Sequence, residues 1–174
     1  MKKIVVKLEP SSIDDAIDEL KSYREELTEK VKILVGKLTQ DGVQVARVQV
    51  SEAQGDSTDA FVDYTVDSTS GDIIRAQIFL QGTDALFIEF GAGIAYNTGK
   101  QHPYASELGY GVGTYPSEHP PNRAMNPGAW VYGHDDDGTP LWSIGTEATM
   151  PIYFAGETIR NNLIQRAIEE FMRG

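Results

Sequence analysis

The chain of 174 residues contains no cysteine. This absence excludes disulfide frameworks, cysteine-ligated zinc and thiol catalysis. Basic residues are also scarce, because 15 lysines and arginines stand against 26 aspartates and glutamates, and the formal net charge is −11 at pH 7. Proteins that grip nucleic acid neutralise its phosphates with basic patches. The composition therefore argues against a DNA-gripping protein.

Long apolar runs and common catalytic motifs are missing as well. No run approaches the roughly 18 residues of a membrane span. The N-terminal MKKIVVKLEP has only the short apolar stretch Ile4–Val6, whereas a secretory signal needs roughly 7–15 apolar residues. The phosphate-loop, dinucleotide and esterase-elbow patterns do not occur. We therefore expect synthesis in the cytoplasm, no membrane segment and no cofactor, and no motif requires an enzyme.

The N-terminal third predicts a strand and then a helix. Residues 3–8 (KIVVKL) are typical of a short strand, and Pro10-Ser11-Ser12 ends it and offers a helix N-cap. Apolar residues then recur at helical spacing, which predicts one amphipathic helix of about 26 residues. They are Ile13, Ile17, Leu20, Leu27, Val31, Leu34 and Leu38. Residues 43–50 (VQVARVQV) fit either a strand or a continuation of the helix.

The remaining elements predict an α+β fold. Residues 60–81 alternate between apolar and polar side chains around the turn at Ser68–Asp72, which indicates a β-hairpin. A short apolar segment follows at 85–90, and a final amphipathic helix starts at Pro151. We expect a single domain, residues 1–174, in which a long N-terminal and a C-terminal helix pack on one face of a small antiparallel sheet.

Segment 91–145 interrupts this scaffold as a long insertion. It holds most of the 17 glycines and six of the eight prolines, and such a long turn-rich stretch in a compact domain is functional or mobile. One hairpin is expected inside it, between 129–132 and 140–144, closed by the acidic loop 134–138. Its aromatic residues favour either a protein interface or the insertion's own small core.

The titratable residues offer few catalytic candidates. Asp135–Asp137 are the best metal candidate, but an EF-hand register places no carboxylate at its first or twelfth position, so a solvated hairpin tip is favoured. His102, His119 and His134 lack the spacing of a zinc pair. Glu89 lies between phenylalanines before a glycine turn, where a carboxylate serves as a general acid or, more commonly, caps backbone N–H groups in the turn that follows it.

Several short motifs resemble a family of tailed-bacteriophage neck proteins, known as minor tail components or tail-completion (head–tail joining) proteins. The similarity lies in Leu86–Gly93 (LFIEFGAG), in His102-Pro103 with Glu107 and Gly109, in Gly113-Thr114-Tyr115, in Trp130-Val131-Tyr132 and in Ala148–Tyr153 (ATMPIY). The sequence departs from the family at Ala92, where threonine is usual, at Gly145–Glu147, where an Asn-Pro stretch is usual, and in carrying Asp135–Asp137.

The resemblance implies a non-enzymatic virion subunit that forms a ring around the DNA path at the head–tail junction. Its partners would be further copies of itself and the neighbouring connector and tail proteins, in the virion after assembly in the host cytoplasm. DNA would pass nearby without specific binding. Ring subunits contact one another through complementary patches. The residues expected at these contacts are Phe90, Tyr104, Tyr110, Tyr115, Trp130 and Tyr132.

The charge distribution suits that role. Residues 41–145 hold 14 acids and four bases, a net charge of −10. This excess of acids fits either a solvated surface or the wall of a lumen that repels duplex phosphates. The proposed repelling set is Asp56, Asp59, Asp63, Asp67 and Asp72. Two alternatives remain: a metal-dependent hydrolase using Glu89 and Asp135–Asp137, and an acidic DNA mimic that binds a basic partner.

Overall fold

The computed structural model describes residues 9–53, 59–70, 73–93, 100–112, 130–143 and 145–172. Its largest element is helix α1, Pro10–Glu52, with 43 residues. The helix begins at Pro10, where a missing N–H costs nothing, and the predicted N-cap at Ser11 or Ser12 is wrong: Glu9 occupies the cap position without a side-chain cap bond. The predicted strand at residues 3–8 lies outside the described residues.

The strand alternative for residues 43–50 is wrong, because these residues form the last turns of α1. Val43 and Ala46 are buried at 3% and 0% exposure and keep the helical spacing towards the core. Gly42 does not break the helix, since it lies where α1 passes closest to its neighbours: a Cβ there would come within 2.8 Å of Ile78 and of Ile159. Packing on both sides therefore outweighs the strand preference of the valines.

The predicted hairpin is confirmed. Strands β1 (Phe61–Ser70) and β2 (Ile73–Gln81) pair antiparallel, with Val62 opposite Leu80 and Asp67 opposite Arg75. The register shifts between Asp67 and Ser70. Alternation directs Val62, Ile78 and Leu80 towards α1. The outer face is mixed: it carries Asp63 and Asp67 but also the exposed Phe61 and Ile73.

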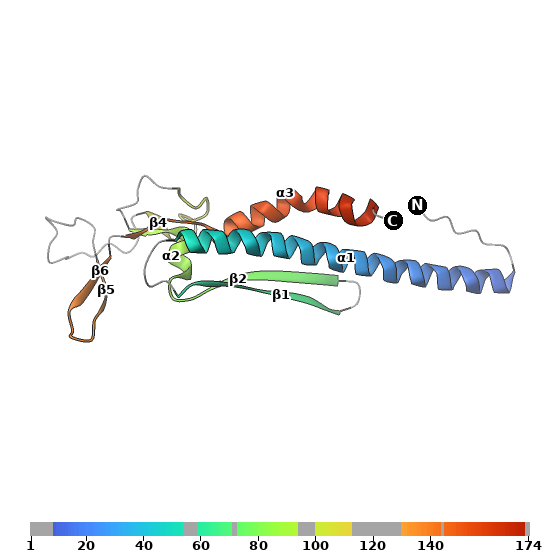
Figure 1. Ribbon diagram of the computed structural model, residues 1–174, viewed down its shortest axis with the longest axis horizontal. Helices are drawn as coiled ribbons and strands as arrows, with labels where there is room; N and C mark the ends of the chain where they lie inside the picture. Colours follow the sequence, from blue (N-terminus) through green and yellow to red (C-terminus); the bar gives the residue numbers. More distant parts are fainter. Residues whose placement is uncertain are drawn as a thin grey trace.

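The hairpin, α1 and helix α3 (Pro151–Met172) form three layers, with α1 in the middle (Figure 1). The core is a cluster of buried residues from all three layers, into which Ile78 and Leu80 also pack: Val43, Ala46, Val62 and Ala155. The α+β class is confirmed. Both helices lie on one side of the hairpin, and α1 provides most of the contact with it.

Ion pairs align α3 with α1 outside this core. The Arg166 guanidinium donates from Nε and Nη2 to the two carboxylate oxygens of Asp41, at 2.9 and 2.8 Å, and Asn162 adds a bond of 3.2 Å. This arrangement holds the pKa of the Asp41 carboxyl below its usual range, chiefly through the hydrogen bond from Arg166. Lys37 donates to Glu170 at 2.6 Å one turn further along the helix pair.

The elements that follow the hairpin gather at one end of the molecule. Helix α2 (Ala85–Phe90) is followed by β3 (Ala92–Gly93), which pairs with β4 (Gly111–Val112) and with β7 (Gly145–Thr146). The two ends of segment 91–145 are thereby hydrogen-bonded to each other. The expected second hairpin is present as β5 (Trp130–His134) and β6 (Pro140–Ser143).

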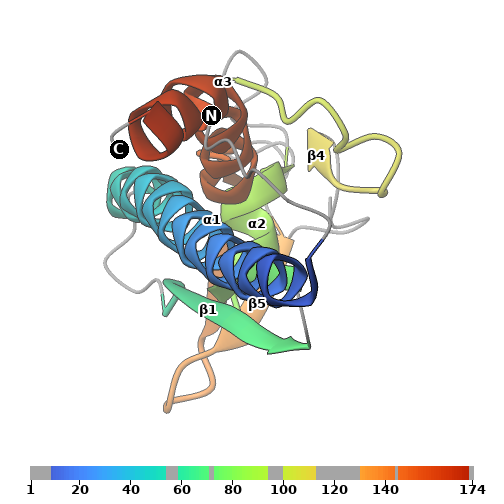
Figure 2. The same ribbon diagram turned by 90° about the vertical axis from the view of Figure 1, so that its right-hand side faces the viewer.

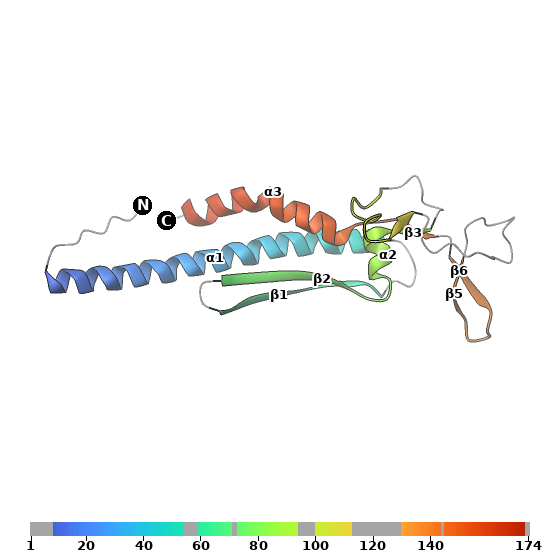
Figure 3. The same cartoon turned by 180° about the vertical axis from the view of Figure 1, so that it is seen from behind.

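The first turns of α1 extend beyond both other layers, at the opposite end of the molecule from β5 and β6 (Figures 1 and 3). Ile13, Ile17 and Leu20 of the predicted apolar stripe are 44%, 44% and 54% exposed there. Viewed along the long axis, α3 and β1 lie on opposite sides of α1 (Figure 2). The stripe therefore packs only in its second half, where Leu34 and Leu38 are buried.

Candidate functional site

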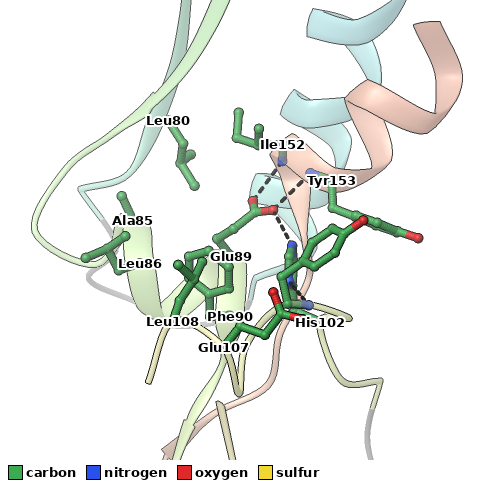
Figure 4. Close-up of a pocket in the computed structure, with 11 residues that line it drawn as sticks. Leu80, Ala85, Leu86, Glu89, Phe90, His102, Glu107, Leu108, Ile152 and Tyr153 are labelled. Atoms are coloured by element: carbon green, nitrogen blue, oxygen red, sulfur yellow. Dashed lines mark hydrogen bonds and ion pairs between the residues drawn. The ribbon is translucent and has the colours of Figure 1, made fainter. Parts of the chain in front are cut away.

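The junction between α2 and α3 is built around a single carboxylate (Figure 4). Glu89, on α2, is 6% exposed and accepts the backbone N–H of Ile152 at 2.8 Å and that of Tyr153 at 2.9 Å. These residues belong to the first turn of α3, which has no partners for its N–H groups within the helix. A negative charge at this position also interacts favourably with the helix dipole.

Glu89 completes the hydrogen bonding of the α3 N-terminus. Pro151 has no N–H, Ile152 and Tyr153 donate to Glu89, and Phe154 donates to the carbonyl of Met150 at 3.0 Å. Met150 has the left-handed φ of 55° at the start of this turn. The prediction that Glu89 caps N–H groups in the glycine turn that follows it is wrong in location: Glu89 caps backbone N–H groups on a helix 63 residues away.

His102 joins this cap from the insertion. The ring is 7% exposed, and its Nδ1 accepts the backbone N–H of Tyr104 at 3.1 Å. The ring proton therefore resides on Nε2, which lies 3.3 Å from Glu89 Oε1. Both Glu89 oxygens are therefore occupied by backbone donors of α3, and the His102 ring lies against one of them.

A hollow of about 660 Å³ opens beside this cap; we call it the α2–α3 hollow. Its lining is mostly apolar and comes from the end of β2, from α2, from residues 102–108 and from the start of α3. Leu86, Tyr104 and Leu108 on its lining are 49%, 54% and 57% exposed, and Glu107 is exposed beside them. Exposed apolar side chains around a hollow are typical of a surface that contacts another protein.

The aromatic residues expected at an interface divide into two groups. Phe90 stacks on Tyr110 with ring centroids 5.1 Å apart, and it meets the edge of His102 at 4.5 Å. Phe90 and Tyr110 are half-buried and form a small core, whereas Tyr104 is exposed. Tyr115 lies outside the described residues, and Trp130 and Tyr132 are described only as backbone of β5.

The acidic loop between β5 and β6 uses its first carboxylate on its own backbone. Asp135 Oδ1 accepts the N–H groups of Asp137 at 3.1 Å and of Thr139 at 2.7 Å. This is the geometry of an Asx turn at a hairpin tip. Within the described ranges, no group of three or more His, Asp or Glu side chains is placed to hold a metal ion.

The proposed repelling aspartates are also divided. Asp59 accepts three hydrogen bonds at the entrance to α2, from the N–H and hydroxyl of Thr83 and the N–H of Asp84. Asp63 and Asp67 are exposed, at strand positions that alternation directs away from α1. Asp56 and Asp72 lie outside the described residues.

The sequence alone indicated neither the Glu89–His102 contact nor the apolar rim of the hollow. Glu89 and His102 are separated by 13 positions that carry no periodic pattern. The Met150-Pro151 pair was the available signal, since proline at the first helical position marks a helix start that needs an external cap. Leu86 and Leu108 gave no signal, because exposure follows from the packing of distant segments.

Comparison of the chain with protein-family models, with curated proteins and with solved structures gave no match in any of the three. Among the helices of the described ranges, none combines the length and apolarity needed to cross a membrane.

Proposed function

We propose that the protein is a non-enzymatic structural subunit at the head–tail junction of a tailed bacteriophage, where copies form a ring around the DNA path. The supporting observation is the use of Glu89, the strongest catalytic candidate of the chain. Both of its oxygens accept hydrogen bonds that join α2 to α3, and one of them contacts His102 of the insertion. A carboxylate occupied in this way serves architecture and is poorly placed to exchange protons with a substrate.

The placement of the neck-protein motifs supports the same proposal. The segments 86–93, 102–109 and 148–153 are far apart in the chain, yet all three line or border the α2–α3 junction. Ile88 contributes its carbonyl, which accepts the N–H of Thr149 at 2.9 Å and of Met150 at 3.3 Å. Three of the five segments that carry the resemblance therefore meet where α2 joins the start of α3.

A ring requires complementary patches on each copy. The exposed apolar rim of the α2–α3 hollow is one candidate, with Tyr104 from the expected contact set and Leu86 and Leu108 added by the geometry. The projecting start of α1 is another, at the far end of the molecule. We expect a monomer or weak oligomer in dilute solution, because such rings form on a template; a stable closed ring in light scattering would contradict this expectation.

Deletion of the gene from the phage or prophage that carries it tests the function. We expect filled heads and free tails in electron micrographs, with joining restored by the wild-type gene in trans. We also expect weaker rescue by a Tyr104→Asp variant whose circular dichroism spectrum is unchanged. Normal yields of infectious particles from the deletion would overturn the proposal.

The orientation of the acidic residues is a separate part of the proposal. In a ring, Asp63 and Asp67 would face the lumen if the face of the hairpin directed away from α1 lines the DNA path. They would then repel duplex phosphates. A density map of the assembled particle tests this directly. An outward-facing hairpin would remove the repulsion while leaving the structural role intact.

A further inference from the structure

The outer edge of β2 could accept an additional strand. Within the described ranges β2 pairs only with β1, so the backbone groups that point away from β1 have no strand partner. Neither strand contains proline or lysine, and the side of the hairpin facing α1 carries no charge. Proline, lysine and inward-pointing charges are among the features that natural proteins use to block pairing at an edge. The hairpin keeps only Arg75 on β2 and a register shift near its turn, which leaves most of the β2 edge open to another strand.

A groove of about 620 Å³ runs along this edge; we call it the β2–α3 groove. One wall is formed by the consecutive residues 74–78 of β2, the other by Ile152, Ala155 and Ile159 of α3, and Val35 and Leu38 of α1 also line it. Because five successive β2 residues take part, whatever their side-chain direction, the wall is the strand edge itself. A groove between an open strand edge and a helix is a site where extended peptides add to a sheet.

Glycine at position 156 keeps the groove open on the α3 side. Gly156 lines the groove and is exposed, and a Cβ placed there would meet nothing within 4 Å. Glycine inside a helix costs about 1 kcal/mol relative to alanine. Here it leaves space beside β2 that a larger side chain would fill.

We propose that this groove receives residues Lys3–Leu8 of a second copy of the chain, added to β2 as a strand. In the sequence KIVVKL, Ile4, Val6 and Leu8 share one side of an extended chain, and Lys3 and Lys7 share the other. Six extended residues span about 20 Å, which suits the stretch of β2 that borders the groove. The apolar side matches the lining contributed by the two helices.

The same segment of the same chain cannot reach the groove. Val35 lies 25 residues beyond Pro10 along α1, a distance of about 37 Å at 1.5 Å per residue. The nine residues before Pro10 span at most about 32 Å when fully extended. This reach is shorter than the distance of about 37 Å to Val35, so residues 3–8 of the same chain fall short of the groove. The donor must therefore be another molecule.

Charge favours one direction of binding. The segment carries Lys3 and Lys7, with Lys2 just before it, and the whole chain has a net charge of −11. The groove lining itself holds one charged residue, Arg75, so the attraction has to come from acidic residues beyond the groove. Ile152 lines both the groove and the α2–α3 hollow, so the groove continues towards the exposed Glu107. A strand antiparallel to β2 begins at that end, which brings its N-terminal lysines near this carboxylate.

Strand donation would connect copies head to tail, as a ring requires. This inference rests on the proposed self-association but names its contact. If the phage needs the gene but the groove does not bind residues Lys3–Leu8, only the inference of strand donation is refuted. A groove that binds the segment in a protein dispensable for head–tail joining would refute only the proposed role.

A labelled peptide of residues 1–9 tests the proposal, titrated with the full-length protein at concentrations where the protein is monomeric. We expect saturable binding by fluorescence anisotropy, with a dissociation constant in the micromolar range. A Val6→Asp peptide should bind about tenfold more weakly or worse, because this side chain enters the groove. A Val5→Asp peptide is the matched control and should lose less, since its side chain points outward.

Two protein variants test the location. Gly156→Phe fills the groove and should lower affinity at least tenfold, whereas Asn161→Phe, at an exposed α3 position outside the groove, should bind as wild type. Circular dichroism confirms that both fold. The proposal is overturned by absence of binding up to millimolar peptide, by equal losses from the two peptide variants, or by unchanged binding to Gly156→Phe.

Discussion

Replacement of Glu89 separates an architectural carboxylate from a catalytic one. Glu89→Ala removes the acceptors of two backbone donors in the first turn of α3, and Glu89→Gln keeps one acceptor but presents an NH2 group to the other donor. A shielded donor without an acceptor costs about 1–3 kcal/mol. The negative charge near a partly buried helix N-terminus contributes up to about 2 kcal/mol.

Two donors and the charge together give an expected loss of about 2–8 kcal/mol for Glu89→Ala, and one donor and the charge give about 1–5 kcal/mol for Glu89→Gln. In a chain of this length 1 kcal/mol corresponds to about 2–4 °C in the melting temperature. Glu89→Ala should therefore melt at least about 4 °C, and up to about 30 °C, below the wild type. The change comes from α3, so the loss should be visible in the helical signal at 222 nm.

The measurement is thermal and urea unfolding of both variants beside Glu107→Gln. Glu107 lines the same hollow but is exposed, and its replacement should change the free energy of unfolding by less than about 0.5 kcal/mol. Catalytic residues are commonly held at a cost in stability, so their replacement leaves stability unchanged or raises it. Equal melting temperatures for Glu89→Gln and Glu107→Gln would refute the capping role and reopen the hydrolase alternative.

Three further predictions concern the helix pair, the metal question and the short strands. The folded-state pKa of Asp41 lies below its unfolded value, so the stabilisation from its carboxylate is complete above the unfolded pKa and is lost as the pH falls through the folded pKa. Urea titrations should therefore show Asp41→Asn less stable than the wild type at pH 7, and the difference in stability should shrink below about pH 4. A difference in stability that is independent of pH would contradict this prediction. Millimolar Ca²⁺, Mg²⁺ or Zn²⁺ should leave the melting temperature unchanged, whereas a rise with any of them would support the metal-dependent alternative. Gly145 has φ 123°, and a Cβ added there would collide with the Ala92 carbonyl, so Gly145→Ala should lower the free energy of unfolding by more than about 3 kcal/mol. Gly138 also has positive φ but open space around it, and Gly138→Ala should cost about 1–2 kcal/mol. Similar losses for the two variants in denaturant unfolding would contradict the role given to the close approach.

Local patterns accounted for the elements whose surroundings are simple. The hairpin at 61–81 follows from strict alternation with one face on α1, and α3 follows from its apolar spacing and the proline at its first turn. The end of α1 was ambiguous, because valines at 43, 45, 48 and 50 satisfy strand propensity and helical spacing alike. Only the burial of Val43 and Ala46 against the hairpin and α3 selects the helix.

The composition and periodicity alone determined the α+β class, the acidic character and the absence of thiol chemistry, because each depends on which residues are present and on their local spacing. The tertiary structure decided what Glu89 does, since its partners Ile152, Tyr153 and His102 come from two other segments. Among the residues that the structure describes, it likewise left the edge of β2 without a second strand beside α3. Hydrogen bonds and grooves of this kind depend on distances between remote parts of the chain, and a linear sequence does not contain those distances.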